Sequence, residues 1–290
     1  MFNTQILSSY AFIVVSIGTF IMAFTAGAVG CITVLKGQSL IGDAIGHASF
    51  PGIVLSFMLF MQRDPAILML GAIIAGATAF SLIQLIKEHS KVELDAVLAI
   101  VLSSFFGLGM VLKSYIQGNP RFAGASQSGL QNYIFGQAAY IMKSDIRLIL
   151  AVAIPSILIL FIFYKEIKVF VFDEVYSQTI GINSLAMNFI IILMTMSLIA
   201  TGLKIVGAIL ISSLLIVPAI TAMQWSNRFD RVLIIAAFIG GISAVLGTYV
   251  STAVKGMSTG PTIILFMSSF ALFSLIFGPN GMIAKYRIRK

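Results

Sequence analysis

The sequence predicts an all-α membrane protein, a bundle of about eight or nine helices that each cross a lipid bilayer. Of its 290 residues, 59% are hydrophobic and 10% are charged, whereas soluble domains carry about 25% charged residues. The mean hydropathy is +1.05. Long charge-free stretches recur along the chain, and each holds the roughly 17–25 apolar residues that a spanning helix needs. Barrel strands would be shorter and would alternate in polarity.

Nine charge-free stretches are long enough to be spanning helices. In chain order they are Met1–Leu35, Ala44–Gln62, Pro65–Ile86, Ala96–Leu112, Leu148–Tyr164, Val175–Leu203, Ile205–Asn227, Val232–Val254 and Gly256–Ala284. Ala96–Leu112 and Leu148–Tyr164 are close to the lower length limit, so the predicted count is eight or nine. Residues 1–290 are expected to form a single transmembrane domain.

Basic residues predict the orientation of the chain in the membrane. The tail Lys285–Lys290 carries four basic residues, and the positive-inside rule places it in the cytoplasm. With nine spans the N-terminus then lies outside, where we expect its first stretch to be a retained span rather than a cleaved signal peptide. Lys36 and the segment 165–183 are expected inside, and Lys143 is expected outside.

Three connections have their own signals. The segment Phe122–Met142 is free of charge but rich in Gly, Ser, Gln and Asn, so we expect a partial or interfacial helix in an outer loop. Thr201–Gly207 is expected to be a tight outer turn between two spans. The pair Gly260-Pro261 predicts the start of the last helix, because proline suits a first turn.

The stretch Ser39–Gly52 carries the most informative polar residues. Asp43 and His47 are spaced i, i+4, so a helix places them on one face, one turn apart. A carboxylate beside an imidazole can bind a divalent cation. Pro51 removes the N–H that would pair with the His47 carbonyl, which predicts a kink or break there. The alternative is structural: a helix cap at Asp43 and a buried, hydrogen-bonded His47.

A second polar stretch, Phe172–Asn183, lies in a predicted cytoplasmic loop. It indicates a short helix that is capped by Asp173 and ends at Gly181. Two interpretations remain open from the pattern alone. The helix is either an ordinary amphipathic loop helix or a docking helix for a cytoplasmic partner.

These stretches together resemble a known family, the membrane permeases of bacterial ABC importers for manganese, zinc or iron (the metal-chelate type). The resemblance covers almost the whole chain and rests on three motifs, namely residues 42–52 around Asp43 and His47, residues 172–182, and Val206–Ala222. Within the family the chain is most similar to manganese permeases of Gram-positive bacteria. Gly46 departs from the pattern, since serine or alanine is more usual before this histidine.

The resemblance implies a set of partners and roles. It implies a homodimer in the bacterial plasma membrane, two cytoplasmic ATPase subunits and an extracellular metal-binding lipoprotein. Asp43 and His47 would line the translocation path, and the divalent metal would be transported rather than permanently bound. The cytoplasmic short helix would be a coupling helix that sits in a cleft of the ATPase, with Phe172, Asp173, Glu174, Val175, Tyr176, Ile180 and Gly181 as its residues.

Sequence features separate this function from its alternatives. The chain has no GxxxxGK[ST] phosphate loop, so ATP hydrolysis would fall to another polypeptide and the chain itself is predicted not to be an enzyme. An intramembrane enzyme is disfavoured because HExxH and a dyad of membrane aspartates are absent. The alternative we keep is a secondary, ion-coupled metal transporter, although such proteins usually carry several intramembrane acids. Mn²⁺ is preferred over Zn²⁺ or Fe²⁺ on the resemblance.

Overall fold

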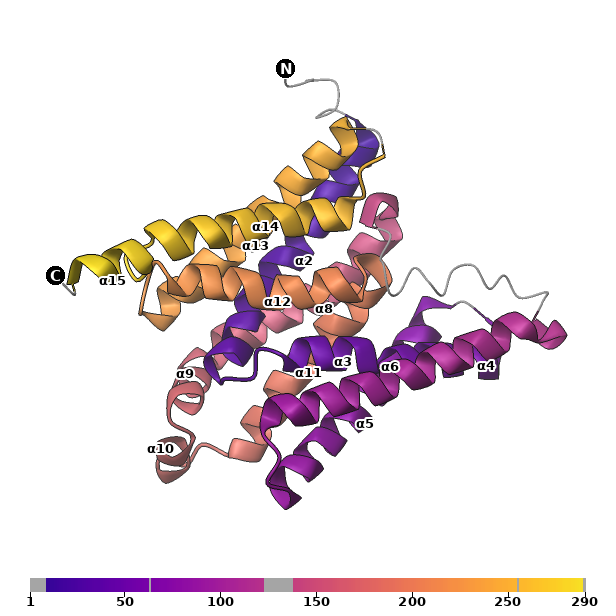
Figure 1. Cartoon of the computed structure of the whole chain (residues 1–290), viewed down its shortest axis with the longest axis horizontal. Helices are drawn as coiled ribbons and strands as arrows, with labels where there is room; N and C mark the ends of the chain where they lie inside the picture. Colours follow the sequence, from indigo (N-terminus) through magenta and orange to yellow (C-terminus); the bar gives the residue numbers. More distant parts are fainter. Residues whose placement is uncertain (1–8, 63, 123–137, 255, 289–290) are drawn as a thin grey trace. The chain divides into compact units, whose positions relative to one another are not determined.

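The computed structural model describes residues 9–62, 64–122, 138–254 and 256–288, and within these ranges the chain forms helices without strands (Figure 1). The helices are α2 (Tyr10–Leu35), α3 (Ile41–Ala48), α4 (Phe50–Phe60), α5 (Pro65–His89), α6 (Leu94–Gly118), α8 (Lys143–Ile162), α9 (Tyr164–Phe172), α10 (Glu174–Thr179), α11 (Ser184–Ile205), α12 (Ala208–Met223), α13 (Phe229–Ala253), α14 (Thr259–Phe277) and α15 (Met282–Ile288). Two short 3-10 turns are η1 (Pro120–Phe122) and η3 (Ala138–Tyr140).

Eight helical stretches in the described residues are long and apolar enough to span a bilayer, with α3 and α4 counted together as Ile41–Phe60. The ninth predicted span is α12, which has 16 residues and at about 1.5 Å per residue is shorter than a bilayer core of about 30 Å. The prediction of eight or nine spans is confirmed. The short helix, however, is α12, because α6 and α8 extend through flanking charged residues to 25 and 20 residues.

The chain divides into two compact units. The first unit comprises Met1–Ser39, Ala138–Leu198 and Ser213–Lys290, and the second comprises Leu40–Gln137 and Ile199–Ser212. Helices α11 and α12 each contribute residues to both units. A single-domain organisation stays a prediction.

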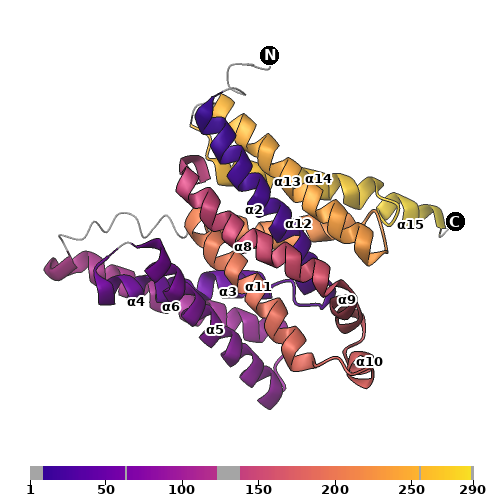
Figure 2. The same ribbon diagram turned by 180° about the vertical axis from the view of Figure 1, so that it is seen from behind.

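In the first unit, α2 is packed between α8 and α13, and α13 also contacts α14 (Figures 1 and 2). Small residues allow this close packing. A Cβ atom on Gly27 would lie 2.7 Å from the carbonyl oxygen of Ala236, and one on Gly240 would lie 2.6 Å from that of Ala23. Because these positions lack a side chain, the backbones of α2 and α13 approach directly.

Different connecting segments contact one another at the two ends of the first unit. At one end, the Lys143 ammonium lies 5.1 Å from the centroid of the Tyr10 ring. At the other end, Lys36 pairs with Glu174 at 3.8 Å, and the side-chain amide of Asn280 donates a 3.0 Å hydrogen bond to the Met223 carbonyl. This grouping agrees with the loops expected outside and inside. The side of the membrane that each end faces stays a prediction.

In the second unit, α3 and α4 lie against α5 and α6, which also contact each other. Glycines again bring backbones together: a Cβ on Gly52 would overlap the carbonyl oxygen of Gly71, and one on Gly109 would lie 2.6 Å from the Phe50 ring. These contacts hold the helix pair that carries Asp43 and His47.

The predicted connections are found with shifted boundaries. The turn expected over Thr201–Gly207 is shorter, because α11 continues to Ile205 and the chain reverses at Gly207, whose φ is +83°. Gly260 and Pro261 lie in the first turn of α14, as predicted. Residues 123–137, most of the predicted interfacial segment, lie outside the described residues.

Candidate metal-transport site

Helix α3 places Asp43 inside its first turn. The helix starts at Ile41, and Leu40 occupies the N-cap position without a side-chain capping bond. Asp43 is therefore not the cap, and that part of the structural alternative is wrong. A carboxylate in the first turn is favoured by the partial positive charge of the helix N-terminus.

Asp43 and His47 face each other along α3. The Nε2 atom of His47 lies 3.6 Å from the Oδ1 atom of Asp43, and the two side chains are 20% and 37% exposed, respectively. This distance is longer than a hydrogen bond. Two atoms that each bind one metal ion at about 2.1 Å lie roughly 3–3.4 Å apart. A shift of a few tenths of an ångström would therefore allow both side chains to bind one ion.

A second helix orients the His47 ring. The rings of His47 and Phe106, on α6, meet edge to face with 5.2 Å between their centroids. The Phe106 ring in turn lies 6.0 Å from that of the buried Phe50, at the start of α4. Sequence reasoning missed Phe106, since it lies in a predicted span and nothing in its neighbouring residues distinguishes it from other apolar positions.

The predicted interruption near Pro51 lies at Ser49, between α3 and α4. The Ser49 N–H and hydroxyl both donate to the Ile45 carbonyl at 2.8 Å. The backbone of Ser49 stays in the right-handed helical region, with φ −73° and ψ −20°, so α3 and α4 follow one another as one span. Pro51 has no N–H, which leaves the His47 carbonyl without its i+4 donor.

The Asp43–His47 pair stands apart from other metal-binding side chains. Among the residues that the structure describes, no group of three or more His, Cys, Asp or Glu side chains could hold a metal ion. One chain therefore supplies two such ligands at this point, within the described ranges. The assignment of Asp43 and His47 as metal ligands stays a prediction.

The short helix in the Phe172–Asn183 stretch is confirmed as α10. The Asp173 carboxylate accepts a 2.8 Å hydrogen bond from the Tyr176 N–H and so caps its start. Gly181 follows its end with φ +86°, a conformation that glycine adopts without strain. Both boundaries follow the predicted residues because capping depends on side chains close in sequence.

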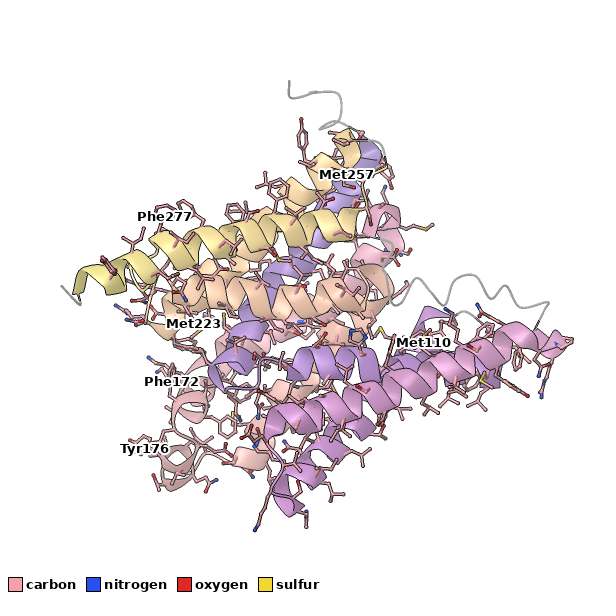
Figure 3. The ribbon with its side chains drawn as sticks, in the orientation of Figure 1. Met110, Phe172, Tyr176, Met223, Met257 and Phe277 are labelled. Atoms are coloured by element: carbon pink, nitrogen blue, oxygen red, sulfur yellow. The ribbon has the colours of Figure 1, made fainter. Side chains whose placement is uncertain are left out.

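Helix α10 and its flanks expose large apolar side chains. Four of them have half or more of their surface exposed, namely Phe172, Val175, Tyr176 and Ile180 (Figure 3, where Phe172 and Tyr176 are labelled). Ser177, by contrast, is fully buried, and its hydroxyl donates a 2.6 Å hydrogen bond to the Glu174 carbonyl. An exposed apolar cluster of this kind marks a surface for another protein or for lipid.

In the part of the chain that the structure describes, eight long apolar helices, one of them carrying an ionisable pair, are typical of a multi-pass membrane protein. Residues 9–278 match the ABC 3 transport family, and the chain belongs to that family. It is accordingly a permease subunit of an ABC transporter in the plasma membrane. The family resemblance predicted from the three motifs is confirmed.

Relatives and a solved structure agree with this assignment. The chain is 39% identical over 272 residues to the manganese transport system membrane protein MntC of Bacillus subtilis strain 168, an alignment that covers 94% of this chain and 62% of that relative. It is 36% identical over 276 residues to the zinc transport system membrane protein TroC of Treponema pallidum strain Nichols, covering 95% and 92%. PsaBC from Streptococcus pneumoniae, solved in complex with a Fab, has a similar fold, with a TM-score of 0.84, 28% identity and coverage of 99% and 98%.

Proposed function

We propose that the chain is the permease of an ATP-driven importer for a divalent transition-metal ion, with Mn²⁺ as the first candidate. The observation that carries this proposal is the Asp43–His47 pair, 3.6 Å apart within a spanning helix of an ABC 3 family member. Relatives named for manganese and for zinc support a metal as the cargo. Ionisable groups inside a span are costly and mark ion pathways.

The chemistry of the pair suits a passing ion. Carboxylate and imidazole accept Mn²⁺, Fe²⁺ and Zn²⁺, and Zn²⁺ would usually bind more tightly than Mn²⁺. Asp43 would replace water on the ion and neutralise part of its charge, while His47 would contribute a neutral nitrogen. The ion passes through the site and is released inward in this proposal, so the metal is cargo and not a resident cofactor.

Energy for import comes from a partner in this proposal. The sequence has no phosphate-binding loop, so a separate cytoplasmic ATPase would hydrolyse ATP and dock on the exposed apolar residues of α10. An extracellular metal-binding lipoprotein would deliver the ion. The secondary-transporter alternative is not favoured, because the chain belongs to an ABC transport family.

A homodimer would complete the metal site. Zn²⁺ usually takes four ligands and Mn²⁺ about six, whereas the described part of one chain offers Asp43 and His47 alone. A two-fold axis repeats each residue in the partner copy. Helices α3 that meet at such an axis would together present two carboxylates and two imidazoles, with water or the His47 carbonyls as further ligands.

Metal accumulation in cells tests the proposal. Cells that lack this chain should contain less Mn than the parent strain when Mn, Zn and Fe are measured together, and the intact chain should restore it. Asp43→Asn and His47→Gln should fail to restore uptake while the protein still reaches the membrane. Asp95→Asn and His89→Gln are matched controls, since Asp95 lies in the first turn of α6 and His89 is exposed at the end of α5. Normal uptake by both site variants would refute the assignment of the ligands.

A further inference from the structure

The side chain of Lys36 brings three helices of the first unit together at one ammonium group. Its Nζ atom lies 2.9 Å from the Oδ1 atom of Asn188 on α11 and 3.8 Å from the Oε2 atom of Glu174 on α10. The same atom lies 3.9 Å from the centroid of the Phe170 ring on α9. Lys36 itself follows the last residue of α2, so four helices meet through it.

Lys36 differs from an ordinary surface lysine in its burial. Its side chain is 9% exposed, whereas that of Glu174 is 45% exposed, and the Phe170 ring beneath it is buried. A half-exposed ion pair contributes little by itself. The ammonium also contacts the amide oxygen of Asn188 and the face of Phe170, and beside them it reaches Glu174, the first residue of α10.

The backbone at Lys36 joins this cluster to the candidate metal helix. The chain leaves α2 through Gly37, whose φ is +69°, with Gly37 N–H bonded to the Val34 carbonyl and Gln38 N–H to the Thr33 carbonyl. These bonds form a glycine-terminated helix end. Only residues 37–40 separate Lys36 from Ile41, where α3 begins, and Asp43 follows two residues later.

We infer that Lys36 is a positioning residue, which holds the coupling helix α10 against the C-terminal end of α2 and relays its movement to the connection that leads into α3. This inference rests on the proposed function, in which α10 docks the ATPase. Helix α10 follows α9 directly in the chain, so movement of α10 would displace both Glu174 and Phe170 at the Lys36 ammonium, and Lys36 is covalently continuous with residues 37–40. Lys36 touches neither the metal nor ATP in this assignment.

The test compares Lys36 variants in the whole importer. The permease is co-expressed with its ATPase, reconstituted into liposomes with the metal-binding lipoprotein, and supplied with Mn²⁺ and ATP. Lys36→Met keeps the aliphatic stem over Phe170 but removes the charge. It should leave ATPase co-purification unchanged and lower the Mn²⁺ imported per ATP hydrolysed about fivefold or more, the size of a typical coupling between sites.

Two further variants separate positioning from folding. Lys36→Arg retains a cation that can contact Phe170 and Asn188, and should restore most of the transport-to-hydrolysis ratio. Lys168→Met removes an exposed lysine from the same short helix, α9, and should match the wild type. Glu174→Gln should have a smaller effect in the Lys36→Met background than in the wild type, because the two side chains act through one contact.

Each result of these experiments either supports or overturns the positioning role of Lys36. An unchanged ratio in Lys36→Met overturns it, as does a loss of assembly in both Lys36→Met and Lys36→Arg, since that would show a structural role only. A lowered ratio that Lys36→Arg restores and Lys168→Met does not reproduce supports it. A wild-type complex without ATP-dependent Mn²⁺ uptake would instead contradict the proposed function, a result that is distinguishable because it does not depend on the Lys36 variants.

Discussion

The imidazole of His47 meets the phenyl ring of Phe106 edge to face, with 5.2 Å between centroids and 86° between ring planes. His47 is on α3 and Phe106 is on α6, so the ring of the candidate ligand is oriented by a helix other than its own. An edge-to-face pair restricts ring rotation, and a metal-binding imidazole needs a fixed orientation to present its nitrogen.

Shortening Phe106 should therefore weaken metal uptake. An aromatic pair contributes about 0.5–1.5 kcal/mol, so in Phe106→Leu the KM for Mn²⁺ uptake should rise by about two- to twelvefold. Initial uptake rates over a range of Mn²⁺ concentrations measure this change. Phe105→Leu is the matched control, because Phe105 lies about 100° away around the same helix. Equal effects of the two substitutions would show that the His47 contact is not responsible.

Helix α3 has room for a methyl group at Gly46, the position that departs from the family pattern. A Cβ there would lie 3.6 Å from the Ser212 hydroxyl and 3.9 Å from the Ile199 side chain, which are ordinary contacts. Gly46→Ala should stabilise the protein by about 0.5–1 kcal/mol, since glycine loses more backbone freedom in a helix. The Tm in detergent should rise by about 1–3 °C, with Mn²⁺ uptake retained.

Gly52→Ala, six residues further along the chain, should have the opposite effect on stability. A Cβ at this position would overlap the carbonyl oxygen of Gly71 on α5, so α4 and α5 would have to separate. The Tm of Gly52→Ala should fall well below that of the wild type. A drop of the same size in Gly46→Ala would mean that α3 is packed more tightly than its contacts indicate.

Features determined by neighbouring residues could be predicted from the sequence. Asp173 caps α10, Gly181 ends it, and Pro261 lies in the first turn of α14. The i, i+4 spacing of Asp43 and His47 fixed their shared face as soon as a helix was assumed. In each of these cases the controlling interaction spans only a few residues, so the local pattern contains the information.

Contacts between distant residues could not be predicted. Phe106 and the partners of Lys36 lie far from His47 and from Lys36 in the sequence, and spanning helices are apolar on most faces, so their periodicity does not indicate which residues meet. The predicted lengths of the spans that became α6 and α8 were wrong for a related reason. The charge pattern predicts helix ends at charged residues, yet Lys113 lies within α6 with its side chain buried, because a long side chain can bury its stem.

The exposed apolar face of α10 should be required for ATPase docking. Val175 is the most exposed of its large apolar side chains, and a glutamate there would place an unpaired charge in an apolar contact. Val175→Glu or Ile180→Arg should lower the ATPase recovered with the permease by about tenfold or more, or uncouple hydrolysis from transport. Pull-down from detergent extracts measures recovery.

Met257→Glu serves as the control for these variants, since Met257 is also exposed and apolar but lies in the connection between α13 and α14, on the predicted outer side. It should leave ATPase recovery unchanged. If Val175→Glu and Ile180→Arg both co-purify with the ATPase and transport Mn²⁺ normally, the coupling assignment of residues 172–182 is wrong.

A metal site shared between two copies of the chain predicts how many ions each chain binds. If two α3 helices meet at a two-fold axis, each dimer should bind one ion tightly, so metal analysis of the purified complex should give about one ion per two chains. A site completed within one chain would give about one ion per chain. Saturating the complex with Mn²⁺ and removing free metal before analysis distinguishes the two stoichiometries.

Cross-linking tests the same arrangement independently. Cys31 is buried, and its thiol donates to the Gly27 carbonyl at 3.3 Å, a bond that serine can replace, so Cys31→Ser gives a suitable background. Asp43→Cys or His47→Cys in that background should link chain to chain through Hg²⁺ or a short bis-maleimide. Asp95→Cys controls for random collisions, and a lysine-reactive cross-linker shows that two chains are present. Efficient dimer capture by that reagent without any link through positions 43 and 47 would exclude a site shared across the axis, because both side chains would then lie too far from their copies to hold one ion together.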